Sequence, residues 1–204
     1  AGYFKDRLPD RLIRGYALLL ASTPAFWIGL LLLMIFAVWL GWLPFGMNLP
    51  AGMTAAEAGI GVRIRHLLLP ALTLGLTGGA NITLHTREKM IAIMESDYVL
   101  FARARGESSG YIVKRHALRN LVLPAITLQF SSISEIFGGS VLVEQVFSYP
   151  GLGQAAIDAG LGSDVSLLLA ITVISTLFVF LGNLVANVLY GVIDPQIRRG
   201  RSHG

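Results

Sequence analysis

The sequence predicts an all-α fold, a polytopic bundle of transmembrane helices, from its composition and its long apolar runs. Of its 204 residues, 54% are hydrophobic and only 14% are charged, whereas a soluble domain carries about 25% charged residues. Four runs are each long enough to cross a bilayer as a helix, which needs about 20 predominantly apolar residues. A chain of this length is expected to form one compact membrane domain over residues 1–204.

The four predicted spans follow the order of these apolar runs. In chain order they are residues 16–43, the stretch between Arg65 and Arg87, the stretch from about residue 120 to just before Glu144, and residues 165–193. Residues 66–76 and 120–130 share a pattern that indicates either an inverted repeat, as in transporters, or, as the favoured interpretation, that Pro70 and Pro124 lie in the first turns of the second and third spans, where the missing N–H group of proline costs nothing. Aromatic residues lie near the ends of several runs, as in the interfacial belts of membrane proteins.

The basic residues predict how the bundle is oriented. Fourteen of the 16 Lys and Arg residues lie before the first span, between the second and third, or after the fourth. Only Arg63 and Arg65 lie on the other side. Because loops rich in Lys and Arg stay in the cytoplasm, both ends of this sequence and the loop 87–119 are predicted to be cytoplasmic. The basic balance therefore reflects membrane topology and not nucleic-acid binding.

The sequence opens on Ala1 with no leader peptide before its first apolar run, so we expect an N-terminal part of the protein to precede it. It contains no cysteine, which excludes disulfides and thiol chemistry in these residues. The four His residues are scattered, with no metal-binding spacing. No Gly-Lys pair occurs, so a Walker A phosphate loop is excluded. We expect no catalytic residue, metal or cofactor in this chain.

A few polar residues lie inside the predicted spans. Glu135 is the only carboxylate there, and ionisable groups in membranes usually face a bundle interior or an aqueous cavity. Gln129 and Asn81 are further candidates for a transport pathway. The alternative for all three is a hydrogen bond to a neighbouring helix or subunit, which is the commoner role of such groups.

One basic segment, broken by glycine, interrupts the apolar sequence. Residues 97–105 predict a short helix with Ser96 at its N-cap position, and Gly106 predicts its end because glycine accepts positive φ. Ser108 or Ser109 is expected to cap a second short helix that leads into the third span. Such an elbow either lies on the membrane through its basic residues or presents a rigid knob to another protein.

The same segment contains two short sequence motifs that are found in a known protein family. Residues 97–106 read DYVLFARARG and residues 115–120 read RHALRN. This pattern is similar to the cytoplasmic loop of binding-protein-dependent ABC importer permeases of the dipeptide, oligopeptide and nickel group, with Arg105 in place of the usual Lys. Four more stretches agree in order: STPAFWIGLLL (22–32), LLLPALTLGL (67–76), GGSVLVEQVFSYPGLG (138–153) and IDPQIRR (193–199).

The resemblance implies a type I-like importer permease that forms half of a translocation pathway. Peptides are the first expected cargo, with nickel or another small solute as the alternative. It implies two ABC ATPase subunits that bind ATP and magnesium, a second homologous permease, an extracytoplasmic binding protein, and a bacterial or archaeal cytoplasmic membrane. The outer FSYPGLG loop (147–153) could touch the binding protein or a gate, or simply form a Pro-Gly turn.

The resemblance also assigns a coupling role to the loop 87–119. The EAA positions of the wider superfamily fall on Leu100, Phe101 and Ala102, and small residues at Ala102 and Gly106 are expected to let the ATPase approach closely. The implied ATPase-coupling residues are Leu100, Phe101, Ala102, Arg103, Ala104, Arg105, Gly106, Arg115 and His116. Two other classes remain open: a secondary transporter driven by an ion gradient, which Glu135 alone would support, and an intramembrane enzyme, which the missing nucleophile–base motifs disfavour.

Overall fold

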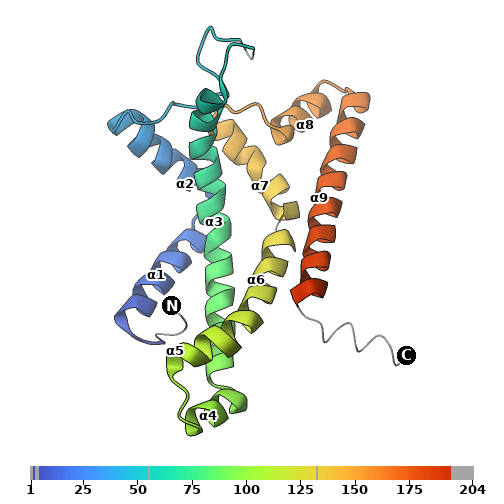
Figure 1. The fold of residues 1–204 in the computed structure, drawn as a ribbon. Helices are drawn as coiled ribbons and strands as arrows, with labels where there is room; N and C mark the ends of the chain where they lie inside the picture. Colours follow the sequence, from blue (N-terminus) through green and yellow to red (C-terminus); the bar gives the residue numbers. More distant parts are fainter. Residues whose placement is uncertain (1, 3–4, 55, 132, 194–204) are drawn as a thin grey trace, which may run out of the picture. The chain divides into compact units, whose positions relative to one another are not determined.

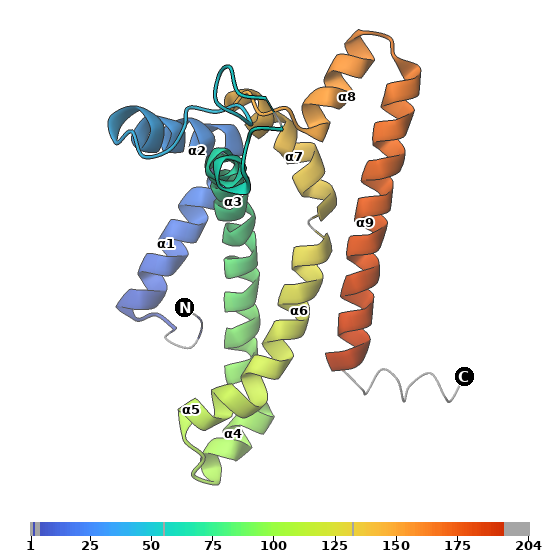
Figure 2. The same cartoon turned by 45° about the horizontal axis from the view of Figure 1, so that its top comes forward.

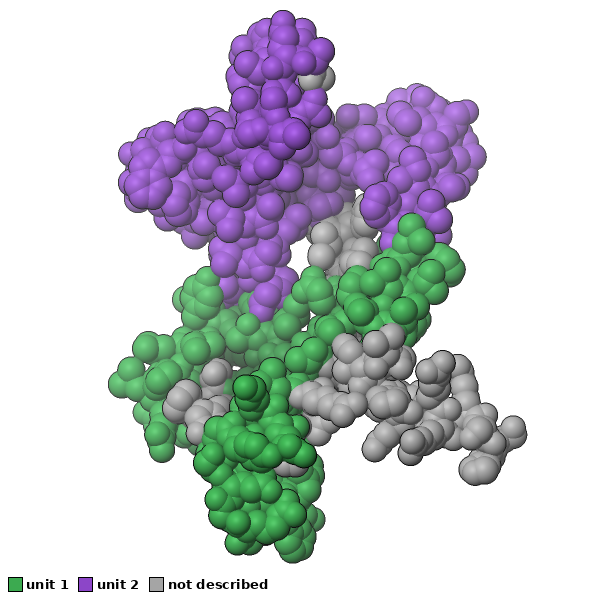
Figure 3. Space-filling model, in the orientation of Figure 1, with its two compact units in different colours: residues 1–19, 80–133, 179–204 green, residues 20–79, 134–178 purple. Residues whose placement is uncertain are grey.

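The computed structural model describes residues 2, 5–54, 56–131 and 133–193. All regular elements in these ranges are helices, which confirms the predicted all-α class (Figure 1). The chain divides into two compact units. Unit 1 comprises residues 1–19, 80–133 and 179–204, and unit 2 comprises residues 20–79 and 134–178 (Figure 3).

The first predicted span is broken into two helices. α1 (Leu8–Ser22) is followed by α2 (Ala25–Leu32), which continues into the π-helical segment η2 (Leu33–Trp39). Pro24 lies at the break, in an extended conformation with φ −58° and ψ 140°. Proline disfavours a helical conformation at the residue before it, so α1 ends at Ser22. The expectation of one continuous helix over 16–43 was therefore wrong, and only together do α1 and α2–η2 meet the length and hydropathy expected of a span.

The second predicted span is part of a longer helix, α3 (Ile60–Met94), of 35 residues. At about 1.5 Å per residue its length is about 52 Å, well beyond the roughly 30 Å of a bilayer core. Its ends therefore carry the basic residues that flank the apolar stretch. Pro70 lies inside α3 and not in its first turn, because the helix begins ten residues before it.

The third predicted span corresponds to α6 (Leu118–Ser131) and α7 (Ile133–Val146), on either side of residue 132. Each has 14 residues, fewer than a bilayer needs. α8 (Leu152–Leu161) follows, and α9 (Val165–Ile193) confirms the fourth predicted span. By length and composition, α3 and α9 could each cross a membrane, and α1 with α2–η2 makes a third candidate within the described chain. The sequence predicted about four.

Each unit has its own apolar core. In unit 2, Leu69, Val143 and Phe147 are at most 1% exposed, and partly buried residues of α2, η2 and α3 pack against them. In unit 1 the core lies where α3 ends and the short helices α4 (Asp97–Ala104) and α5 (Ser109–Ile112) begin. Both ribbon views show α4 and α5 beside this end of α3 (Figures 1 and 2).

Candidate functional site

The predicted elbow is formed by α4, a glycine turn and α5, with boundaries close to those expected. Ser96 lies at the N-cap position of α4 in an extended conformation, and Asp97 is in the first turn, where the helix dipole favours a carboxylate. The Ser96 hydroxyl does not cap α4. It donates to the carbonyl of Ile93 at 2.5 Å, so it ties the start of the elbow to the end of α3.

Gly106 ends α4 as predicted. Its φ is +82°, a conformation that glycine adopts readily and other residues rarely do. The Gly106 N–H donates to the Arg103 carbonyl at 2.9 Å, and the Glu107 N–H donates to the Ala102 carbonyl at 3.1 Å. These two bonds form a Schellman motif, which satisfies carbonyls left open at a helix end. Backbone hydrogen bonds therefore hold the turn in one conformation, unlike a flexible linker.

The second helix of the elbow runs directly into the following helix, α6. Of the two serines expected as possible N-caps of α5, Ser108 is the one that caps it, because its hydroxyl accepts the Tyr111 N–H at 3.4 Å. α5 continues through a π-helical segment, η3 (Val113–Ala117), into α6 without a break. Backbone hydrogen bonds therefore connect the elbow mechanically to α6.

A small apolar core makes the elbow one packed body. Val99 of α4, Ile112 of α5 and Ala117 of η3 are fully buried, and they pack with Met90 and Ile93 of α3. Side chains at positions i and i+3 share one face of a helix. Val99 and Ala102 therefore form the inner face of α4, and Ala102 is only 2% exposed in the same core.

The expectation that Ala102 lets a partner approach closely stays a prediction, and the structure shows where its side chain lies. The methyl group points into the core shared by α3, α4 and α5, so its small size allows α4 to pack within this chain. The residues that α4 presents outward are Leu100 and Phe101, which are 65% and 69% exposed. Arg103, Ala104, Arg105 and Gly106 are also exposed.

An open hollow of about 520 Å³ lies along one side of α4, lined by Tyr98, Phe101, Ala102, Ala104 and Arg105. The only charged group among these lining residues is Arg105, whose guanidinium pairs with Glu107 at 2.8 Å. Exposed apolar side chains beside a charged group are typical of protein–protein interfaces, in which an apolar centre is surrounded by polar residues.

The remaining predicted coupling residues lie on the second arm. The Arg115 guanidinium carbon lies 5.7 Å from the centroid of the Tyr111 ring, within the range of a cation–π interaction. Arg115 is thus held on the surface of the elbow. The side chain of His116 lies outside the described residues.

The structure describes the side chains of two of the three predicted pathway residues. Asn81 of α3 and Gln129 of α6 are both exposed on unit 1, and the side chain of Glu135 lies outside the described part of the chain. Their role as pathway or interface residues stays a prediction.

Sequence reasoning missed a carboxylate at the turn between α7 and α8 in unit 2. Glu144 of α7 accepts the Gln154 N–H at 2.7 Å, in the first turn of α8. A Cβ atom at Gly151 would lie 2.2 Å from the Glu144 carboxyl carbon. A Cβ at Gly153 would lie 2.5 Å from Val141 Cγ2. The two glycines therefore leave room for the Glu144 side chain, which caps α8. The sequence signal that could have predicted this cap is a carboxylate seven residues before the first glycine of a Gly-x-Gly sequence.

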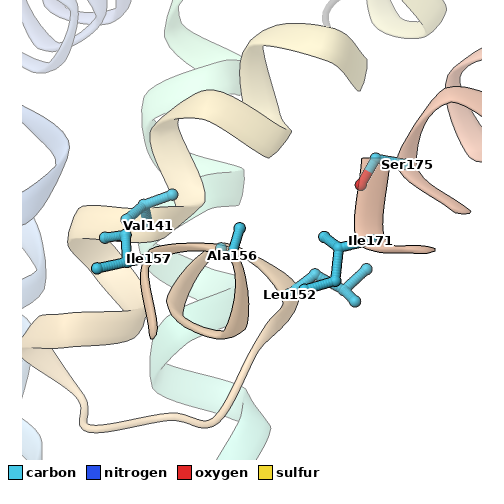
Figure 4. Close-up of a pocket in the computed structure, with 7 residues that line it drawn as sticks. Val141, Leu152, Ala156, Ile157, Ile171 and Ser175 are labelled. Carbon is cyan, nitrogen blue, oxygen red and sulfur yellow. The ribbon is translucent and has the colours of Figure 1, made fainter. Parts of the chain in front are cut away.

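Beside this turn, residues of α7, α8 and α9 line an apolar hollow of about 300 Å³ (Figure 4). Its lining includes Leu152 and Ile157 of α8 and Ile171 of α9. The hollow is open and carries one hydroxyl, that of Ser175, so it offers no charged group to a ligand.

Comparison with known proteins gives a consistent result. The family model described as "binding-protein-dependent transport system inner membrane component" matches residues 1–199. The oligopeptide transport system permease protein AppB of Bacillus subtilis is 41% identical over 176 residues, which cover 86% of this chain and 55% of AppB. The glutathione transport system permease protein GsiC of Escherichia coli K12 is 36% identical over 198 residues, which cover 97% of this chain and 60% of GsiC.

The chain therefore spans a little more than half the length of these curated relatives. The family match covers nearly all of the chain, including the elbow and the turn between α7 and α8. On this basis the chain belongs to the family of binding-protein-dependent transport system inner membrane components, which are membrane permeases.

Proposed function

We propose that this chain is part of the membrane permease of an ATP-driven peptide importer, and that the elbow docks on the ATPase subunits. The observation that carries the docking proposal is the pair of exposed apolar side chains, Leu100 and Phe101, on a helix whose opposite face is locked in a core. A rigid body with an exposed apolar tip suits a docking contact better than a freely mobile loop, because less conformational entropy is lost on binding.

The proposed coupling follows from how the elbow is attached. α4 packs against the end of α3 through Met90 and Ile93, and α5 is continuous with α6. A displacement of α4 by a moving ATPase would therefore be passed to two membrane helices at once. The shared core keeps this displacement from being absorbed within the elbow, since packed interiors have low compressibility.

The remaining parts of the assembly belong to the same proposal. Two ATPase subunits would bind ATP and magnesium, a second homologous permease would complete the pathway, and an extracytoplasmic protein would deliver the cargo. The loop 87–119 and both ends of this sequence would face the cytoplasm, as the basic residues predict. This chain would contribute no cofactor and no catalytic residue of its own.

Peptides are the favoured cargo because the relatives named above carry an oligopeptide and glutathione, itself a tripeptide. Nickel or another small solute remains the alternative cargo, and an ion-gradient-driven transporter is the alternative mechanism. Uptake into vesicles separates the two mechanisms. ATP-driven uptake should persist when ionophores collapse the ion gradients and should stop with vanadate, whereas the reverse result would favour secondary transport.

The docking proposal is tested with Leu100→Glu and Phe101→Glu in the full-length permease, expressed with its partners. Each substitution places a carboxylate where an apolar contact is proposed, and neither disturbs the elbow core. We expect ATPase subunits to be lost from the purified complex, with transport reduced at least tenfold and membrane insertion unchanged.

The matched control is Leu161→Glu, because Leu161 ends α8 in unit 2, whereas the elbow belongs to unit 1, and Leu161 is 83% exposed. This variant should retain its ATPase subunits and its transport activity. If the two α4 variants keep both properties as well, the elbow is not the docking site. If transport is lost while the ATPase subunits stay bound, α4 couples the ATPase to transport but does not contribute to the affinity of the permease for the ATPase.

A further inference from the structure

α1 carries a stripe of arginines along one face. Arg7, Arg11 and Arg14 are all exposed, and the Arg11 N–H donates to the Arg7 carbonyl at 3.0 Å, so helical spacing extends to Arg7. With 3.6 residues per turn, positions i, i+4 and i+7 fall within about 60° of the helix circumference. The three guanidinium groups therefore project from a single strip of surface about two turns long.

These three arginines have no carboxylate partner among the described residues, whose ion pairs are Lys5–Glu95, Arg87–Asp10 and Arg105–Glu107. The one acidic residue of α1, Asp10, lies three residues after Arg7 and four before Arg14, but it is 1% exposed and its carboxylate pairs with Arg87. Arg87 of α3 donates to both of its oxygens, from Nε at 2.7 Å and from Nη2 at 2.6 Å. This bidentate contact anchors α1 to α3, and the three arginines are exposed with the helix so anchored.

A row of apolar side chains runs parallel to the arginines. Leu8, Leu12 and Tyr16 follow one another at i, i+4 and i+8, and they are 72%, 65% and 55% exposed. A helix with one basic row and one exposed apolar row suits the boundary between lipid headgroups and acyl chains. Arginine stems can lie along apolar surface while their charged ends reach the headgroups.

We propose that Arg7, Arg11 and Arg14 form a binding surface for anionic phospholipids, whose phosphate groups the guanidinium groups contact while Leu8, Leu12 and Tyr16 contact the acyl chains. Arginine presents a planar set of donors that matches phosphate oxygens. The neighbouring apolar row favours a lipid over an acidic protein segment, which would need no such row. The proposal is independent of the cargo and of the ATPase contact.

Native mass spectrometry of the full-length permease tests the proposal. The protein is extracted into nanodiscs of phosphatidylcholine that contain increasing fractions of phosphatidylglycerol, and the retained lipids are counted. The variant R11Q/R14Q removes two guanidinium groups of the stripe. Each basic residue at an anionic membrane surface contributes about fivefold in affinity, so we expect on the order of a 30-fold loss of phosphatidylglycerol affinity with phosphatidylcholine retention unchanged.

The control variant K89Q/K114Q removes the same charge from exposed lysines elsewhere in unit 1. If this control retains as much phosphatidylglycerol as the original protein, the result supports a lipid-binding surface on α1. Equal losses in the two variants would mean that only net charge matters and would overturn the proposal, as would unchanged retention in R11Q/R14Q. Thermal unfolding of each variant verifies that neither change has disrupted the fold.

Discussion

Gly106 holds a backbone conformation on which the elbow depends. Its φ of +82° places the Gly106 and Glu107 N–H groups against carbonyls of the last turn of α4. Any residue with a Cβ pays about 1–2 kcal/mol in this region. Proline is excluded more strongly, since its φ is fixed near −65° and it has no N–H to donate. The glycine is therefore needed for its backbone conformation and not for lack of space, because a Cβ atom at this position would have no atom of a non-adjacent residue within 4 Å.

The first prediction compares Gly106→Pro with Gly106→Ala in uptake and ATPase assays. Proline should abolish coupling while membrane insertion stays intact, and alanine should weaken it mildly through a strain of about 1 kcal/mol. Gly110→Ala is the control, because Gly110 lies in α5 with open space around it and alanine favours helix. Full transport activity in Gly106→Pro would contradict the role given to this turn.

Glu144 shows how a residue can acquire its role from distant neighbours. Its carboxylate fits between Gly151 and Gly153 and accepts an N–H group at the start of α8. The N-cap position of α8 is itself a glycine and offers no side-chain acceptor. A carboxylate from the preceding helix supplies what the local sequence lacks, and the helix dipole favours its charge there.

At the scale of elements, the elbow is a short helix pair stabilised by a core that neither helix could form alone. α4 has eight residues and α5 has four, and isolated helices of this length are unstable in water. Their stability comes from burying Val99, Ala102 and Ile112 against α3. The elbow is therefore rigid only as long as this core is filled.

The second prediction is that Ile112→Ala loosens α4. Removing a fully buried isoleucine side chain costs about 2–5 kcal/mol through lost burial and the cavity left behind. Hydrogen exchange of the α4 amides should accelerate, because local opening becomes easier, and coupling should fall with it. Ile64→Ala, at a site that is 53% exposed, should leave α4 exchange unchanged. Unchanged protection of α4 in Ile112→Ala would show that the core does not hold it.

A second element-scale feature is the loop between η2 and α3. The ring nitrogen Nδ1 of His66, a buried residue of α3, lies 2.9 Å from the Gly46 carbonyl, and the Met47 N–H donates to the Phe147 carbonyl at 2.8 Å. A Cβ at Gly46 would lie 2.1 Å from the same Phe147 carbonyl. The loop is therefore pinned by backbone contacts that only a glycine at this position permits.

At the scale of the whole molecule, α3 belongs to both units: residues 60–79 lie in unit 2 and residues 80–94 in unit 1. The elbow and its core lie entirely within unit 1, and the turn between α7 and α8 lies within unit 2. The basic residues predict that the elbow is cytoplasmic. The same prediction puts the loop before α3 on the opposite side of the membrane.

The third prediction tests this orientation by chemical labelling. The 204 residues contain no cysteine, so Lys114→Cys and Ala51→Cys each introduce one thiol in the sequence studied. A membrane-impermeant maleimide should label Ala51→Cys in intact spheroplasts and Lys114→Cys only in inside-out vesicles. Other cysteines of the full-length protein are first replaced. Labelling of both positions from the same side would contradict a crossing by α3, and the reverse pattern would contradict the orientation.

Much of the elbow could be predicted from its sequence because its boundaries depend on local backbone chemistry. Ser96, Gly106 and Ser108 mark its ends through conformations and hydrogen bonds that reach at most a few residues along the chain. The side on which Ala102 lies could not be predicted in the same way. It depends on which face of α4 meets α3 and α5, and a short amphipathic segment does not determine that.

The sequence by itself determined the membrane class, the continuous fourth span, the helix–glycine–helix elbow and the family, because apolar run length, glycine backbone freedom and ordered motifs are local properties of the chain. Only the tertiary structure decided that Ala102 is internal, that Leu100 and Phe101 face outward, that Asp10 pairs with Arg87, and that Glu144 caps α8. These features join residues ten to 77 positions apart or select one face of a helix. They arise from packing between elements, which no local pattern specifies.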